Sequence, residues 1–211
     1  ITLKNSFHGR TITTLAATGQ DVFHQDFTPL TEGFVYAAAN DIEEIESLTE
    51  QYSCAAIMME LVQGEGGVNA LDKEYVKSVA ALAAQKDILL LCDEVQTGNG
   101  RTGKLYAYMN YGIMPDIVST AKGLAGGLPL GATMLGEKVQ NVLTAGSHGS
   151  TFGGNPVCCA AALSILNRLD ETVFYKPLTR DNIRAIVDLI LKDLDHRLEE
   201  KQLHIQVTDE A

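Results

Sequence analysis

Lys122 is the residue of this sequence that is best placed for covalent chemistry. It lies in the stretch "STAKGLAGGLPLGA" (residues 119–132), and no other charged side chain occurs between Asp116 and Glu137. A lysine in apolar surroundings loses its proton readily, and the neutral amine can attack a carbonyl carbon to form a Schiff base. Most lysines are instead solvated surface charges. The covalent interpretation therefore requires that the chain also supplies a site for a carbonyl compound.

Two carboxylates, Asp93 and Glu94, follow directly after the apolar run "ILLLC" (residues 88–92). A carboxylate at the end of a buried strand is costly unless it meets a partner. A pyridinium nitrogen is one such partner, because an ionised carboxylate beside it keeps the ring protonated and a better electron sink. Capping a helix N-terminus is the structural alternative for Asp93.

The segment after these carboxylates also offers a nucleotide-binding interpretation. Gly98, Gly100 and Gly103 spell a GxGxxG pattern, and the same residues nearly match a Walker A loop. A Walker A loop needs Ser or Thr after its lysine, where this chain has Leu105. A dinucleotide fingerprint needs an acidic residue at the end of the next strand, whereas Asp116 begins one. Both matches are weak, and protection by ATP or NAD would test them.

The elements that must position these residues follow from the apolar pattern. Residues 72–86 predict a helix with one apolar face, made of Val76, Val79, Ala80 and Ala83. Strand-like apolar runs occur at residues 54–61, 88–92, 116–120 and 130–136. Strands that are apolar on both faces and alternate with helices predict an α/β fold with a mostly parallel sheet covered by helices. In such sheets, ligands bind beyond the carboxyl ends of the strands.

The pattern changes towards the end of the chain. Residues 155–169 predict a helix with Pro156 in its first turn, and residues 183–198 predict a second helix. The segment "DETVFYKPLT" between them indicates a boundary, so we expect one domain over residues 1–172. Residues 173–211 would hold a connecting helix and the start of a small C-terminal domain.

Composition narrows the class of protein. The chain has 211 residues, 45% of them hydrophobic, which is enough for a buried core. A net charge of -11 argues against nucleic acid or an anionic membrane as a partner. The four cysteines lie in apolar segments without metal-ligand spacing, which favours reduced thiols in the cytoplasm and no metal site. The missing initiator Met suggests a piece of a longer protein.

Taken together, the motifs resemble the class III pyridoxal-phosphate-dependent aminotransferases. Five of them occur in that family's order between residues 5 and 156: "NSFHGRT", "ELVQGEGG", "DEVQTGNGRTG", "STAKGLAGGLPLGA" and "SHGSTFGGNP". The resemblance implies the large domain of a fold-type I transferase, with the start of a small α+β domain after it. It also implies pyridoxal 5'-phosphate as the cofactor, and a small amino donor and a 2-oxo acid as substrates.

The resemblance assigns a role to each cofactor-binding residue. Lys122 would hold the cofactor covalently and later move the proton of the substrate Cα, and Asp93 would pair with the ring nitrogen. Gln96 would reach the ring hydroxyl, while Val95 and Phe7 would pack on the two faces of the ring. Taken alone, Phe7 would be an ordinary core aromatic.

The resemblance also implies substrate contacts and a dimer. Thr151 would donate to the phosphate of the neighbouring subunit's cofactor, so the active site would be shared within a homodimer. Arg10 would clamp the α-carboxylate of the substrate, a bidentate task that suits a guanidinium group. Glu60 and Glu65 would lie near the substrate entrance, and Ser150 would be a further substrate contact.

Some features depart from the family or leave the substrate open. Leu61 stands where the family usually has Pro, and the family's Gly-rich phosphate segment and C-terminal arginine are expected outside these residues. The segment "SFHGR" favours N-acetylornithine as the amino donor in arginine biosynthesis, because ornithine-specific members tend to carry a bulkier aromatic residue at His8. Ornithine, succinyl-diaminopimelate, 4-aminobutyrate and an inactive remnant of the fold remain alternatives. His8 itself is predicted to be structural or to support a site residue.

Overall fold

The computed structural model describes residues 1–170. The chain separates into two units, Ile1–Val173 and Phe174–Ala211, and every described residue belongs to the first unit. The second predicted helix and the start of the predicted C-terminal domain therefore lie outside the described residues. The domain boundary at residue 172 stays a prediction.

Strands and helices alternate along most of the described chain. The strands are β1 (Thr2–Leu3), β2 (Tyr36–Ala37), β3 (Ala56–Met59), β4 (Val62–Gln63), β5 (Asn69–Ala70), β6 (Leu89–Asp93), β7 (Ile117–Thr120) and β8 (Ala132–Leu135). The α-helices are α1 (Ile12–Ala17), α2 (Ile42–Gln51), α3 (Lys73–Gln85), α4 (Tyr108–Tyr111) and α5 (Pro156–Asp170). Two short 3₁₀ turns, η1 (Asp21–Phe23) and η2 (Lys122–Ala125), complete the set.

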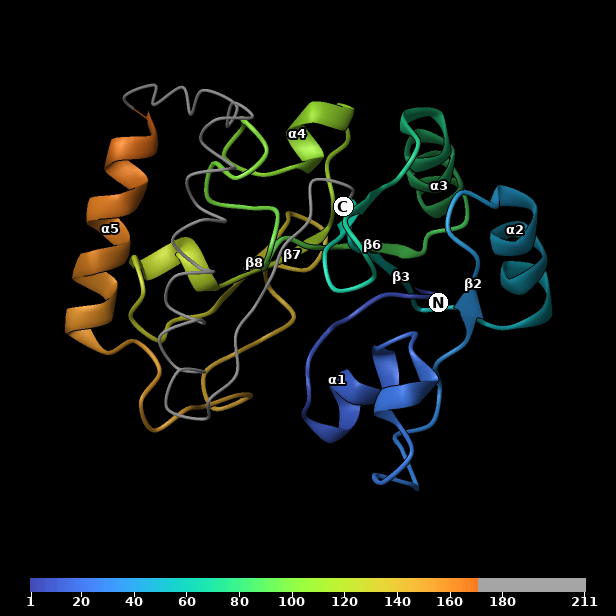
Figure 1. Cartoon of the computed structure of the whole chain (residues 1–211), viewed down its shortest axis with the longest axis horizontal. Helices are drawn as coiled ribbons and strands as arrows, with labels where there is room; N and C mark the ends of the chain where they lie inside the picture. The colour runs from blue at the N-terminus through green and yellow to red at the C-terminus, as the bar shows by residue number, and fades with distance from the viewer. Residues whose placement is uncertain (171–211) are drawn as a thin grey trace, which may run out of the picture. The chain divides into compact units, whose positions relative to one another are not determined.

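The main sheet has four strands in the order β3-β6-β7-β8 (Figure 1). β6 pairs in parallel with β3 on one side and with β7 on the other, whereas β8 runs antiparallel to β7. These are the four strands that the apolar runs predict. Because β3, β6 and β7 are parallel, their carboxyl ends lie along one edge of the sheet.

Helix α3 forms because its apolar residues recur every three to four positions. Its buried residues are Tyr75, Val76, Val79, Leu82 and Ala83. They join the apolar side chains of β3 and β6 in one core, against which Ala80 is partly buried. The helix prediction for residues 72–86 is confirmed to within one residue at each end.

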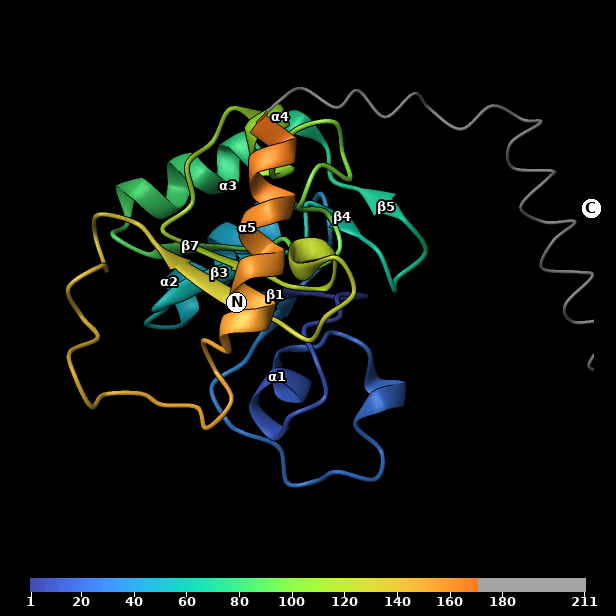
Figure 2. The same cartoon turned by 90° about the vertical axis from the view of Figure 1, so that its left-hand side faces the viewer.

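Helices cover both faces of the sheet. Helices α3 and α4 lie on one side, and α1 lies on the other side (Figures 1 and 2). Helix α5 lies at the β8 end of the sheet and begins at Pro156, as the sequence predicts (Figure 1). It packs on η2 through a small core of Leu124, Ala125 and Ala162. The turn that contains Lys122 therefore has an apolar support of its own.

The segment before α1 is held against the edge of the sheet. β1 pairs in parallel with β2, and Met58 N donates to Ile1 O at 2.9 Å, which places β1 beside β3. Residues 5–10 follow β1 and run towards the carboxyl ends of β3 and β6. No helix within residues 1–170 is long and apolar enough to span a membrane.

Candidate active site

Asp93 and Lys122 come from neighbouring parallel strands at the same edge of the sheet. Asp93 is the last residue of β6 and pairs in register with Ser119 of β7. Lys122 follows the end of β7 by two residues and begins the turn η2. The carboxylate and the amine thus both lie where an open α/β sheet binds its ligands.

The Asp93 carboxylate is buried, with 7% of the residue exposed. Its Oδ2 lies 2.8 Å from Nδ1 of His8, and its Oδ1 accepts a hydrogen bond from Val95 N at 3.1 Å. Because an ionised carboxylate only accepts hydrogen bonds, the contact requires a proton on Nδ1 of His8. A carboxylate can accept about four hydrogen bonds, so Asp93 retains capacity for a further donor.

His8 is the residue whose role the sequence left least defined. Its side chain is fully buried, and its backbone N–H donates to Thr18 Oγ1 at 3.0 Å. Within residues 1–170, its Nε2 is buried without a hydrogen-bond partner. His8 thus supports Asp93, as the sequence allowed, but this contact spans 85 positions and no spacing rule could have found it.

Glu60 ties residues 5–10 to the end of β3. It is 2% exposed, its Oε1 accepts from Phe7 N at 2.7 Å, and its Oε2 accepts from Gly64 N at 3.1 Å. Burial raises the pKa of this carboxyl group; the two N–H groups and His8 oppose the rise, and Asp93 adds to it. The predicted substrate contact of Glu60 is not tested, but both of its oxygens already bind the backbone.

Phe7 and Arg10 form a small aromatic and cationic group. The Phe7 ring meets Phe23 edge to face, with ring centroids 5.6 Å apart. The guanidinium carbon of Arg10 lies 4.6 Å from the Phe23 centroid and 5.6 Å from the Phe7 centroid. Such contacts hold a guanidinium group while leaving its N–H donors free to bind an anion. Arg10 remains solvent-exposed, as a carboxylate clamp requires.

Gln96 and Gly64 bring the loops after β3 and β6 together. A Cβ atom on Gly64 would lie 2.6 Å from Oε1 of Gln96, so the end of the Gln96 side chain packs directly on the Gly64 backbone. Glu65 follows Gly64 and is exposed, and Val95 is half-buried beside Asp93. The loops that carry the predicted cofactor and substrate residues therefore meet at the carboxyl edge of the sheet.

Ser150 and Thr151 are not joined to this group. Both lie exposed in the segment between β8 and α5, where Ser150 Oγ accepts from Gly153 N at 3.0 Å. In the described part of the chain, no hydrogen bond links either residue to Asp93, Lys122 or residues 5–10. Their predicted roles stay predictions.

Glu94 has a structural role. It is 1% exposed, and its carboxylate accepts from Ala107 N and Tyr108 N at 2.9 Å each and also from Thr97 Oγ1. These donors include the first N–H of α4, so Glu94 caps that helix across the intervening loop. The Glu94 carboxylate is thus satisfied by backbone N–H groups and by the Thr97 hydroxyl.

The glycine pattern after Glu94 does not form a nucleotide fingerprint. Residues 94–105 make successive turns instead of opening a long helix, and α4 has only four residues. A Cβ atom on Gly98 would lie 2.7 Å from Glu94 O and 2.9 Å from the Tyr106 ring. Gly98 is therefore required by packing, and the nucleotide interpretation loses its structural basis.

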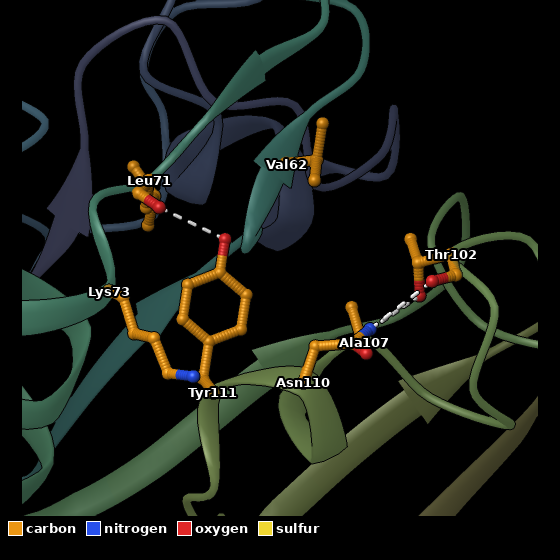
Figure 3. Close-up of a pocket in the computed structure, with 7 residues that line it drawn as sticks. All are labelled: Val62, Leu71, Lys73, Thr102, Ala107, Asn110 and Tyr111. Atoms are coloured by element: carbon orange, nitrogen blue, oxygen red, sulfur yellow. Dashed lines mark hydrogen bonds between the residues drawn. The ribbon is translucent and has the colours of Figure 1, made fainter.

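A separate pocket of about 290 Å³ lies beside helix α4 (Figure 3). The hydroxyl oxygen of Tyr111 lies 3.0 Å from Leu71 O and 3.1 Å from Leu61 O, so its one O–H is shared between the two carbonyl groups. Its lining residues are Val62, Leu71, Lys73, Thr102, Ala107, Asn110 and Tyr111. None of the predicted site residues is among them, so this pocket is distinct from the group around Asp93.

Comparison with known proteins agrees with this arrangement. Residues 1–208 match the family model of the class III aminotransferases. The acetylornithine aminotransferase of Haemophilus ducreyi is 56% identical over 180 residues, which are 85% of this chain and 46% of that protein. The succinylornithine transaminase of Yersinia pseudotuberculosis is 46% identical over 171 residues, or 81% of this chain and 41% of that protein.

The solved structures give the same class. The ornithine aminotransferase of Toxoplasma gondii, whose structure has PLP at partial occupancy in its active site, superposes with a TM-score of 0.76 and 37% identity. The match covers 81% of this chain and 40% of that one. The chain belongs to the class III aminotransferases, and the predicted α/β fold with its mostly parallel sheet is confirmed. It spans about half the length of the curated relatives it matches.

Proposed function

We propose that this protein is a pyridoxal-phosphate-dependent aminotransferase that exchanges an amino group between N-acetylornithine and 2-oxoglutarate in arginine biosynthesis. The observation that carries the proposal is the placement of Asp93 and Lys122 at the ends of adjacent parallel strands. The names of the most similar relatives support the choice of amino donor. The family relationship supports the reaction class.

The residues present fit the cofactor. Asp93 is a buried acceptor with spare capacity, and His8 orients it from the side. Lys122 is solvent-exposed, not enclosed by apolar side chains as its sequence neighbours suggest, and it lies at the same edge of the sheet. Bound pyridoxal phosphate would supply an electrophilic carbonyl carbon and a ring that accepts the electrons released at the substrate Cα.

The chain's own groups would perform the remaining tasks. Asp93 holds a proton on the ring nitrogen, and His8 Nδ1–H keeps the Asp93 carboxylate in place. Lys122 Nζ would hold the cofactor and would accept the proton that leaves the substrate Cα. Arg10 binds the substrate α-carboxylate from its position on Phe7 and Phe23.

Further contacts complete the proposed site. Phe7 and Val95 flank the ring, and Gln96 reaches its hydroxyl group. Ser150 contacts the substrate, and Glu65 helps to distinguish the distal amine of one substrate from the carboxylate of the other. These assignments are supported by the matching motifs.

The protein is proposed to act as a homodimer in the cytoplasm. Thr151 would donate to the phosphate of the cofactor bound by the neighbouring subunit, so that each site needs both chains. Its exposure on the segment before α5 supports a contact outside its own subunit. The four cysteines are all free, which supports a reducing compartment.

A donor comparison tests the substrate. The complete protein with pyridoxal phosphate is assayed for glutamate formation from 2-oxoglutarate with N-acetylornithine, N-succinylornithine or ornithine as donor. We expect kcat/KM for N-acetylornithine to exceed that for ornithine by at least about tenfold. Equal or preferred use of ornithine would contradict the proposal. N-succinylornithine is the second candidate, because a relative of 46% identity is named for it.

A further inference from the structure

The Asn99 side chain ties the loop after β6 to the backbone immediately before Lys122. Its Nδ2 donates to Thr120 Oγ1 and to Ala121 O, both at 3.2 Å. A Cβ atom on Gly123 would lie 3.5 Å from the Asn99 Cβ. The side chain therefore contacts Thr120 and the peptide that precedes Lys122, and its Cβ lies beside Gly123.

The backbone at this point is unusual for residues other than glycine. Lys122 has φ +47° and Asn99 has φ +57°, both in the left-handed region, and Ala121 has φ -162° and ψ -146°. Non-glycine residues occupy the left-handed region rarely, and they stay there only where the surroundings hold them. The Ala121 carbonyl belongs to the peptide that sets φ of Lys122. A hydrogen bond to this carbonyl therefore bears on the direction of the lysine side chain.

The Asn99 amide donates to the Ala121 carbonyl but leaves its own oxygen without a partner among the described residues. Ala121 O can only accept, so the atom that faces it must be the amide nitrogen. This orientation leaves Asn99 Oδ1 buried without a partner among the residues that the structure describes. An unpaired buried acceptor is destabilising, and an apolar side chain would avoid it. The position thus keeps a donor directed at Ala121 despite the penalty.

We infer that Asn99 is a positioning residue for Lys122. Through its hydrogen bond to Ala121 O it fixes the peptide that precedes the lysine, and so it directs Nζ towards the site at the end of β6. This inference rests on the proposed function. The inference goes beyond the proposed function because it gives a role to Asn99, which is not among the cofactor and substrate contacts described above.

A simpler role for Asn99 would be to supply a left-handed turn, which asparagine tolerates better than most residues. Asn99→Gly separates the two roles, because glycine keeps the backbone conformation and lacks the amide. Asn99→Asp is the second variant, since it keeps the side-chain shape and turns an acceptor towards Ala121 O. Asn110→Ala is the matched control. It removes two amide hydrogen bonds, to Thr102 O and Thr102 Oγ1 at 3.3 Å, in the separate pocket of Figure 3.

The experiment uses the complete protein loaded with pyridoxal phosphate. Two quantities are measured for each variant: the rate of cofactor loss after dilution, and the midpoint of the pH titration of the visible absorption band. We expect Asn99→Gly and Asn99→Asp to lose cofactor about three- to tenfold faster and to shift the midpoint. Asn110→Ala should match the wild type. An Asn99→Gly protein that behaves like the wild type in both measurements would overturn the inference.

Failure of the proposed function would be recognised separately. If the wild-type protein carries no cofactor on Lys122, the proposed function fails. The inference is then judged in the cofactor-free protein, by the rate at which trinitrobenzenesulfonate modifies Lys122. A rate that changes in Asn99→Gly and not in Asn110→Ala supports the inference, and equal rates in all three proteins overturn it.

Discussion

Asp93 is a buried carboxylate that uses only part of its hydrogen-bonding capacity among residues 1–170. If it holds the proton on the cofactor ring, Asp93→Asn removes one partner of a buried charge pair, at a cost of about 2–5 kcal/mol. We expect kcat/KM to fall by a factor that corresponds to this range. Steady-state assays with N-acetylornithine measure it.

Asp87→Asn is the matched control for this substitution. Asp87 is an exposed aspartate that pairs with Lys138 at 2.7 Å, away from the carboxyl edge of the sheet. Its replacement should leave kcat/KM unchanged. Equal activities of Asp93→Asn and Asp87→Asn would show that Asp93 has no part in the reaction.

Glu60 gives the stability of the protein a defined pH dependence. Burial raises its pKa above the ordinary value of 4.5. The folded state therefore binds more protons than the unfolded state in the window above 4.5, and stability is lost as the pH rises through the folded pKa. Glu60→Gln removes this titration. We expect the unfolding free energy of Glu60→Gln to increase relative to that of the wild type as the pH rises above 4.5.

Denaturant titrations at several pH values measure this gain. Asp87→Asn serves as the reference, because Lys138 lowers the pKa of Asp87 and the carboxylate is ionised in both states above about pH 5. The difference between Asp87→Asn and the wild type should stay flat over the same range. A flat difference for Glu60→Gln as well would contradict the role assigned to burial.

Among the secondary-structure elements, helix α4 depends on the Glu94 carboxylate to cap its first N–H groups. Three donors converge on this buried carboxylate, from Thr97, Ala107 and Tyr108. Glu94→Ala would leave buried donors unpaired, each at about 1–3 kcal/mol. We expect a loss of unfolding free energy in that range or above it, measured by denaturant unfolding.

Glu74→Ala is the control for the Glu94 substitution. Glu74 is exposed on α3 and pairs with Lys77, and a surface pair of this kind contributes about 0–1 kcal/mol. Its loss should change stability by less than about 1 kcal/mol. Similar effects of Glu94→Ala and Glu74→Ala would contradict the capping role.

The sequence predicted the elements whose pattern is local. The strands of the main sheet are continuous apolar runs, and helix α3 has apolar residues at helical spacing. Both patterns can be read within a short stretch of sequence. The two-residue strands β1 and β2 carry no such signal, because Thr2 pairs with Tyr36 far along the chain. Helix α2 is likewise absent from the sequence prediction, although Asp41 caps it by accepting from Glu44 N at 2.9 Å.

The candidate site also contains residues that the sequence predicts and contacts that only the fold reveals. Asp93 and Lys122 could be predicted, because both follow strands and their chemistry is visible in the residue types. The His8 contact with Asp93 joins residues 85 positions apart and follows only from the fold. The Asn99 contact depends on left-handed backbone at two non-glycine residues, which residue identity does not reveal.

The proposed dimer is a property of the whole molecule. Several large apolar side chains of the chain stretch that includes Thr151 are exposed, among them Phe152 at 85%, Val142 at 70% and Val157 at 66%. Contiguous apolar patches on a protein surface mark interfaces, and we propose that these side chains belong to one that forms in the dimer. We expect Phe152→Asp to weaken dimerisation of the complete protein by about 2 kcal/mol or more, measured by sedimentation equilibrium.

Met114→Asp is the control for the dimer prediction. Met114 is 80% exposed and precedes β7, at the amino end of the strand and away from the carboxyl edge. Its substitution should leave the dimer intact. A wild-type protein that sediments as a monomer would contradict the shared active site, and so would equal dissociation constants for Phe152→Asp and the wild type.

The most direct measurement of the proposed chemistry is the visible absorption spectrum of the protein with pyridoxal phosphate, followed by borohydride reduction and peptide mapping. We predict an absorption band of lysine-bound cofactor, with the reduced label on Lys122. The label should be absent from a Lys122→Ala variant. A label spread over other lysines, or a spectrum identical to free cofactor in the complete protein, would contradict the assignment of Lys122 as the covalent site.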